Sequence, residues 1–185
     1  MKLEGGLLMK ERLVALLLVL SLGLVAPAKR EEGGEGLFHQ DQYRLKAPEG
    51  WIFDDESLAE SGGELAIYPR GSVEKSAKVK IYAHGGTLGE QETFEQHIEQ
   101  ARQSYKVDSP STKFSDLPDL NTESGLVARV IAFTTLRKSG FAGQVAFIAV
   151  PPRRVVTIAL YSKPELLNDS LAAFEYVVAS FRLPE

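Results

Sequence analysis

The sequence predicts an α+β fold: a central antiparallel β-sheet of about six strands packed with helices. The first observation is a run of three strands over residues 126–162, joined by two short turns that carry Gly or Pro. Strands joined by such short turns must be antiparallel. The second observation is a change of hydrophobic period, from two to about 3.6, over residues 90–107 and again over residues 171–181. Because both faces of the strands carry apolar groups, the sheet requires helices to cover it.

Residues 1–28 have the pattern of a secretory signal peptide. Residues 13–25 are apolar apart from Ser21 and Gly23, follow basic residues, and lead into Ala-Pro-Ala at 26–28, which supplies the small residues of a cleavage site. The apolar run is shorter than the ~20 residues that a membrane helix needs. We therefore expect export to the periplasm or the extracellular space, with an uncleaved N-terminal membrane anchor as the alternative. The sequence leaves open whether Met1 or Met9 is the true start.

The charged, Gly-rich residues 29–36 predict a flexible linker, so residues 37–185 are expected to form a single domain. Strands are predicted at 43–47, 64–69 and 78–83. Trp51, the only tryptophan, follows a Pro-Glu-Gly turn. It is expected to be a core anchor at that turn, and contact with a ligand at the surface is the alternative.

The helix predicted within residues 90–107 has one apolar stripe and a capping box formed by Thr93 and Gln96. Residues 108–125 predict a loop with one short strand at 112–115. After the three central strands, the polar residues 168–170 offer capping groups for a last helix. Its apolar stripe is formed by Leu171, Phe174, Val177, Val178 and Phe181.

Composition excludes several classes of function. The chain has no cysteine, which excludes disulfides, thiolate catalysis, Cys-ligated zinc and lipid attachment through an N-terminal Cys. The formal net charge of −4 argues against nucleic acid as a partner, because phosphate binding needs a basic surface. Three histidines are present, none of them three or four residues from another, so no helix face presents a histidine pair to a metal.

Two short motifs at the ends of the domain resemble those of PsbP-like proteins. They are Tyr43-x-x-x-x-Pro48-x-Gly50-Trp51 and Val177-Val178-Ala179-Ser180-Phe181. PsbP-like proteins are exported extrinsic proteins, the best known of which attach to the lumenal side of photosystem II, and the similar DcrB-like proteins are periplasmic. The resemblance implies an α-β-α sandwich and no catalytic residues. Because one fold hosts many functions, the resemblance does not fix a partner, and no other pattern points to photosynthesis.

Candidate sites for small ligands are few. Ser72-x-x-Lys75 has the form of a β-lactamase nucleophile motif, but its companion motifs are absent. His84 precedes two glycines at the end of a predicted strand, where it could meet a ligand or simply be solvated. The oxygen-bearing residues Asp119, Asn121 and Glu123 alternate as ligands do in calcium loops. They are candidates for a divalent metal ion, and a solvated acidic loop is the alternative.

The two turns of the central strands carry basic pairs, Arg137-Lys138 and Arg153-Arg154. Each pair could bind an acidic protein surface or lipid headgroups, or could simply keep a hairpin tip soluble. The resulting hypothesis is an exported, non-enzymatic accessory protein, without a cofactor, that docks to a protein partner in the cell envelope, with peripheral membrane contact as a possibility. The alternatives are a carrier of small molecules or metal ions that uses a sheet–helix cleft near Trp51 and His84, and a hydrolase. The sequence does not indicate an oligomeric state.

Overall fold

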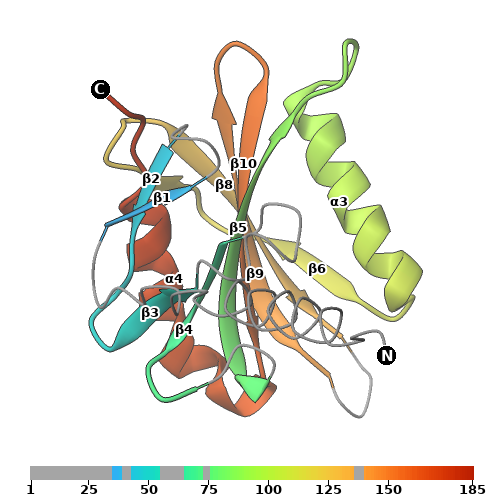
Figure 1. Cartoon of the computed structure of the whole chain (residues 1–185). Coiled ribbons are helices and arrows are strands. Elements are labelled where there is room, and N and C mark those ends of the chain that lie inside the picture. The colour runs from blue at the N-terminus through green and yellow to red at the C-terminus, as the bar shows by residue number, and fades with distance from the viewer. Residues whose placement is uncertain (1–34, 39–42, 55–64, 73–75, 136–139) are drawn as a thin grey trace, which may run out of the picture.

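The computed structural model describes residues 35–38, 43–54, 65–72, 76–135 and 140–185 (Figure 1). The leader predicted at residues 1–28 lies outside the described residues. None of the helices in the described ranges combines the length and hydropathy needed to cross a membrane. Glu35 and Gly36, assigned above to a linker, belong to strand β1 (Glu35–Phe38), which pairs with β2 (Tyr43–Lys46). That part of the linker prediction is wrong because backbone pairing does not require apolar side chains.

The main sheet has eight strands, and every pair in it is antiparallel, as predicted. Their order across the sheet is β3-β4-β5-β10-β9-β8-β6, and β7 also pairs with β8. The bounds are β3 (Trp51–Asp54), β4 (Leu65–Pro69), β5 (Val79–Thr87), β6 (Lys113–Asp116), β7 (Leu120–Asn121), β8 (Val127–Thr134), β9 (Ala142–Val150) and β10 (Arg154–Ser162).

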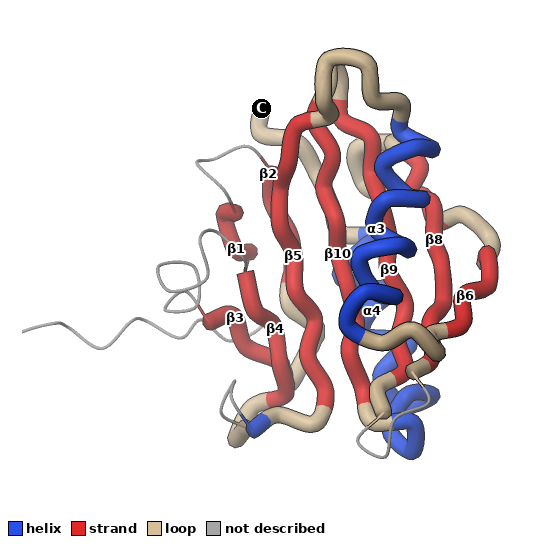
Figure 2. Tube along the Cα trace, turned by 90° about the vertical axis from the view of Figure 1, so that its right-hand side faces the viewer, coloured by secondary structure: helices blue, strands red, loops and turns tan. Residues whose placement is uncertain are grey.

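The helices cover opposite faces of this sheet and make the predicted α-β-α sandwich. The helix α3 (Phe94–Asp108) lies over one face, and the 3-10 turn η2 (Pro164–Leu166) with α4 (Leu167–Ala179) lies on the other. Figure 1 views the sheet from its edge with α3 and α4 on either side, and Figure 2 shows α3 in front of the strands with α4 behind them. The sequence predicted the layers correctly, with fewer strands than the structure contains.

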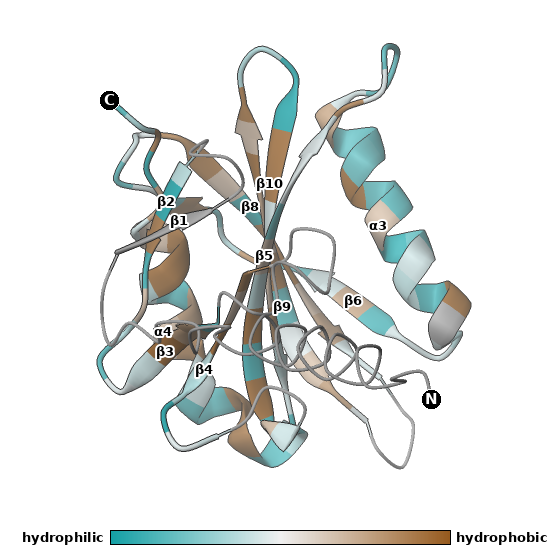
Figure 3. Ribbon diagram, viewed as in Figure 1, coloured by the Kyte–Doolittle hydropathy of each residue, from teal (hydrophilic) through white to brown (hydrophobic). Residues whose placement is uncertain are grey.

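The larger core lies between the sheet and α4. Residues 156, 158 and 160 of β10 face this side, together with 146 and 148 of β9, because alternate residues of a strand share one face. The α4 residues Phe174, Val177 and Val178, with Phe181 just beyond the helix, are fully buried against them. Figure 3 shows that α4 carries more hydrophobic residues than α3, whose residues are mostly hydrophilic. The α3 side therefore holds a smaller core.

The two helices begin differently. At α3, Thr93 is the N-cap, and both hydrogen bonds of the predicted capping box with Gln96 are present. At α4, the residue before the helix is Leu166, which makes no side-chain cap. The capping prediction for residues 168–170 is wrong because the 3-10 turn that starts at Pro164 leads directly into the helix. Ser170 instead lies inside α4 and donates a hydrogen bond to the carbonyl oxygen of Leu166 at 2.7 Å.

The two motifs that carry the resemblance contact each other. The rings of Tyr43 and Phe181 pack with centroids 5.4 Å apart. The backbone N–H of Lys46 donates to Oγ of Ser180 at 2.9 Å, and Arg44 and Arg182 exchange two backbone hydrogen bonds. These motifs therefore close the domain by joining its first described strands to its last residues.

Candidate functional site

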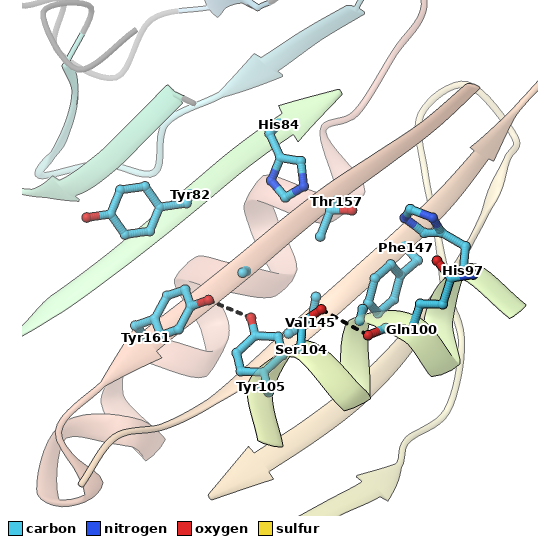
Figure 4. Close-up of a pocket in the computed structure, with 12 residues that line it drawn as sticks. Tyr82, His84, His97, Gln100, Ser104, Tyr105, Val145, Phe147, Thr157 and Tyr161 are labelled. Carbon is cyan, nitrogen blue, oxygen red and sulfur yellow. Dashed lines mark hydrogen bonds between the residues drawn. The ribbon is translucent and has the colours of Figure 1, made fainter. Parts of the chain in front are cut away.

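A cleft of about 520 Å³ lies between α3 and the face of the sheet that α3 covers (Figure 4). Strands β5, β9 and β10 supply its floor, and α3 supplies one wall. Its polar and aromatic lining consists of Tyr82, His84, His97, Gln100, Ser104, Tyr105, Phe147, Thr157 and Tyr161. A cleft of this size and mixed lining has the properties of a small-ligand site.

Strand alternation explains which residues reach the cleft. On β5, Ile81 and Ala83 are buried on the α4 side, so Tyr82 and His84 point to the opposite face. In the β5–β10 pairing, His84 lies opposite Thr157. Both side chains therefore face α3, as Figure 4 shows.

Aromatic rings line one end of the cleft. The hydroxyl groups of Tyr105 and Tyr161 are hydrogen-bonded at 2.5 Å, which joins α3 to β10. Both rings also pack on Phe133, with centroid separations of 5.0 Å for Tyr105 and 5.4 Å for Tyr161. The ring of Tyr82 meets that of Tyr161 edge-on at 5.9 Å. Such edge and tilted pairs are the favoured geometries of aromatic contacts, so this end of the cleft is preorganised.

At the other end of the cleft, a carboxylate orients a histidine. Oε1 of Glu92 lies 3.0 Å from Nδ1 of His97, and its other oxygen accepts the backbone N–H of Gly89 at 2.8 Å. The Gly89 hydrogen bond, with His97 and the Arg153 charge adding to it, holds the pKa of Glu92 below its usual value. The ring of His97 also meets that of Phe147 edge-on at 6.3 Å. The imidazole is thus fixed by both its carboxylate partner and its packing.

This arrangement offers hydrogen-bonding groups but no assembled nucleophile. A carboxylate–histidine pair can serve as a general base only when a hydroxyl or a substrate lies within reach. Among the described residues, no hydroxyl group hydrogen-bonds to His97. Ser104, which lines the same cleft two helical turns further along α3, donates to the backbone carbonyl of Gln100 at 3.1 Å. The chemistry that the cleft supports most directly is reversible binding of a ligand through rings, imidazoles, amide and hydroxyl groups.

The structure does not bring Trp51 and His84 into one cleft. Trp51 is half-buried in β3 and packs against the core on the α4 side, whereas His84 lies inside β5 on the α3 side. The sequence could place each residue on a strand but could not show which helix covers which face. Trp51 thus has the core contact expected of it, and only His84 lines the cleft.

The basic residues of the β9–β10 turn take part in the fold. The guanidinium of Arg153 donates to the carbonyl oxygen of Gly89, and its own carbonyl accepts the N–H of Leu88 at 2.8 Å. Arg153 thereby ties this turn to the loop that precedes α3, and Arg154 opens β10. Arg137 and Lys138 lie outside the described residues. The role of these four residues in binding stays a prediction.

The three candidate metal ligands lie close in sequence but point to different partners. Asp119 forms an ion pair with Arg129 at 3.1 Å, and Glu123 forms one with Lys46 at 2.6 Å. Asn121 is exposed in β7. Within the described parts of the chain, no cluster of three acidic or histidine side chains could hold a metal ion. The divalent-metal alternative therefore gains no support from this loop.

Sequence reasoning did not single out Tyr82, Tyr105 or Tyr161 as site residues. Tyr105 lies in α3 and Tyr161 lies in β10. Their meeting depends on the position at which α3 crosses β10, which no local pattern encodes. The alternation of Lys80, Tyr82 and His84 on one face of β5 was the available signal.

The arrangement of helices on both faces of an antiparallel sheet is that of the PsbP-like fold. Cyanobacterial PsbP (CyanoP) from Synechocystis sp. PCC 6803, a solution structure, matches it with a TM-score of 0.57 at 13% sequence identity. The match covers 89% of this chain and 99% of that chain. Neither a protein-family model nor a curated protein matches the sequence. The resemblance inferred from the two terminal motifs is therefore confirmed at the level of the fold.

Proposed function

We propose that this chain is an exported, non-enzymatic accessory protein that docks to a larger assembly in the cell envelope. The observation that carries the proposal is the extent of the match with CyanoP, which leaves almost none of that chain without a counterpart. PsbP-like proteins act as accessory subunits of membrane-associated assemblies, and a chain with the same complete domain suits the same kind of role. The leader-like residues 1–28 support export.

The site geometry also favours binding over catalysis. His97 is held by Glu92, the hydroxyl group of Ser104 donates to a backbone carbonyl, and those of Tyr105 and Tyr161 bond to each other. Catalytic constellations bring several groups together at one reacting atom, and the described residues offer no such convergence around His97.

The test is recovery of partners from intact envelopes. The full chain, tagged at its C-terminus, is crosslinked in its native host, and the membrane fraction is separated on a native gel. We expect part of the protein to migrate with a larger complex and to be released by high salt, because rim charges are screened. Migration as the free chain alone, with and without crosslinker, would contradict docking.

A charge-reversal variant tests the basic turn as the contact. Arg153→Glu with Arg154→Glu should reduce the crosslinked complex, whereas Lys113→Glu, an exposed strand residue of β6, should not. Because Arg153 also holds the loop before α3, circular dichroism must first show that the variant is folded. An unchanged complex in a folded variant would remove this turn from the interface.

A second candidate function is a small-molecule carrier, which the cleft beside α3 favours. Its half-buried rings and imidazoles lie together without an assembled nucleophile, as expected for a site that binds and releases a ligand unchanged. This candidate uses the α3 face, whereas the basic turn lies at the end of β9 and β10, so one chain could perform both functions.

A further inference from the structure

A second hollow continues the cleft along the same face of the sheet. It has a volume of about 310 Å³, and it shares Tyr82 and Tyr161 with the cleft beside α3. The sharing follows from the strand register, because Lys80 lies opposite Tyr161 and Tyr82 lies opposite Ala159 in the β5–β10 pair. The two hollows therefore form one groove in which the tyrosine rings are the boundary.

Lysine side chains surround the second hollow, which we name the lysine pocket. Its walls are the rings of Tyr82, Phe141 and Tyr161, and its rim carries Lys78, Lys80 and Lys163. Nζ of Lys163 lies 4.6 Å from the ring centroid of Phe141, and Nζ of Lys80 lies 5.9 Å from that of Tyr82. The ammonium groups thus stand over aromatic faces, which attract cations.

Two of the three lysines at this pocket have no carboxylate beside them in the part of the chain that the structure describes. Neither Lys78 nor Lys80 takes part in an ion pair among those residues. Lysines gathered at a concave apolar surface repel one another and focus a positive potential into it. An anion placed among them relieves that repulsion and accepts charge-assisted hydrogen bonds.

The walls specify the rest of the ligand. A ligand with a flat aromatic ring can make stacked or edge-on contacts with the rings of the pocket wall. Inorganic phosphate makes no such contacts and would leave these rings exposed to water. An acyl chain is a poor fit, because Tyr82 and Tyr161 are only half-buried and the open groove would leave much of the chain solvated. A volume near 300 Å³ suits a compact ligand.

We propose that the lysine pocket binds a small aromatic anion, a carboxylate or phosphate carried on an aromatic ring. The ring lies against Tyr82, Tyr161 and Phe141, and the anionic group is held by the lysines at the rim. A longer ligand extends past the tyrosines to the imidazoles of His84 and His97. The inference rests on the carrier function proposed above, and it names the ligand class and the subsite for its charge.

The experiment is a titration of the full chain with matched probes, followed by calorimetry and by amide NMR shifts. The probes are 1-naphthoate and 1-naphthyl phosphate as aromatic anions, 1-naphthol as the neutral ring, decanoate as the acyl anion, and inorganic phosphate. We expect the two aromatic anions to bind, with shifts at residues 78–82 and 140–142, and the other three probes to bind at least roughly ten-fold more weakly, because each lacks one half of the recognition. Equal binding of 1-naphthol, decanoate or phosphate would overturn the proposal.

Lys80→Glu provides the residue-level test. This substitution should weaken the binding of 1-naphthoate by roughly ten-fold or more, because the charge at position 80 then repels the ligand's carboxylate in place of attracting it. Lys113→Glu should leave the affinity for 1-naphthoate unchanged. Unchanged 1-naphthoate binding in Lys80→Glu, together with loss of the crosslinked envelope complex, would assign the lysines to protein docking and overturn the proposal. If Lys80→Glu loses 1-naphthoate binding while the crosslinked envelope complex still forms, the proposal is supported. Loss of 1-naphthoate binding supports the proposal equally if neither the wild type nor any variant forms such a complex.

Discussion

The ring of Tyr43 in β2 packs against the ring of Phe181, which follows α4, and the two ring centroids lie 5.4 Å apart. Both rings are almost fully buried in the core on the α4 side. This contact and the backbone bridge between Arg44 and Arg182 fasten the C-terminal residues to the N-terminal strand. The two motifs that indicated the fold are therefore structural elements and supply no ligand contacts to the cleft.

The first prediction concerns this contact. Phe181→Ala should lower the free energy of unfolding by about 3–5 kcal/mol, because it removes a fully buried ring and leaves a cavity. Tyr176→Ala is the matched control, since that ring lies on α4 but is 47% exposed, and it should change the stability by no more than about 0.5 kcal/mol. Urea denaturation followed by circular dichroism measures both. Equal effects of the two variants would contradict the structural role assigned to the motif.

The second prediction is an alkaline loss of stability that depends on Tyr43. Burial raises the pKa of the Tyr43 hydroxyl far above its ordinary value. The folded protein therefore keeps this proton at a pH where the unfolded chain releases it. Stability from this group is intact below about pH 10 and falls above it, by at most about 1.4 kcal/mol per pH unit.

Tyr43→Phe removes this titration. The decline in unfolding free energy between about pH 9.5 and 11 should be shallower in Tyr43→Phe than in the wild type. Denaturation curves at several pH values measure the slope, and the other alkaline groups cancel because both proteins contain them. Identical slopes would mean that Tyr43 titrates alike in the folded and unfolded chains.

The third prediction concerns Glu92 and acid. Its pKa is lowered, chiefly by the N–H of Gly89, so its carboxylate contributes stability above the ordinary pKa, and this contribution disappears as the pH falls through the lowered value. Glu92→Gln should therefore lose less stability than the wild type between about pH 5 and 3. The difference should shrink in high salt. Glu90→Gln, a change in the same loop outside this hydrogen-bond network, should retain the wild-type profile.

Most of the fold could be predicted because it is encoded locally. The three central strands alternate apolar residues, α3 carries its capping box, and both helices have apolar stripes. The short edge strands were harder: β6 has mostly exposed residues and is held by backbone pairing with β8, so only its approximate place could be predicted, and β7 was missed. Edge strands of this kind leave little hydrophobic pattern in a sequence.

The candidate site could be predicted only in part, because it depends on the register of the paired strands and on where α3 crosses the sheet. His84 was a candidate from its place on a strand, but its neighbours in the cleft come from a helix and from two other strands. Trp51 was grouped with His84 although the two residues face opposite helices. Alternation assigns residues to faces but does not say which helix covers each face, and this information arises only from the assembled sheet.

The last prediction concerns the glycine beneath the tyrosine end of the cleft. Gly143 lies opposite Tyr161 in the β9–β10 pair. A Cβ atom there would lie 1.8 Å from the backbone oxygen of Leu160 and 2.9 Å from Cε1 of Phe133. Since the oxygen belongs to the neighbouring strand, the two strands would have to separate. The cost of Gly143→Ala should therefore exceed the usual overpacking range of about 1–3 kcal/mol.

Gly86→Ala is the matched control in β5. Its Cβ would lie 3.6 Å from Cγ1 of Val155, an ordinary contact, so its stability should stay within about 1 kcal/mol of the wild type. Urea denaturation compares the two variants, and NMR of the aromatic rings reports on the Tyr105–Tyr161 hydrogen bond. If Gly143→Ala still folds, that bond should be lost and ligand binding in the groove weakened, because the strand that carries Tyr161 must move. A Gly143→Ala protein with wild-type stability and an intact tyrosine pair would contradict the close approach of β9 and β10 at this point.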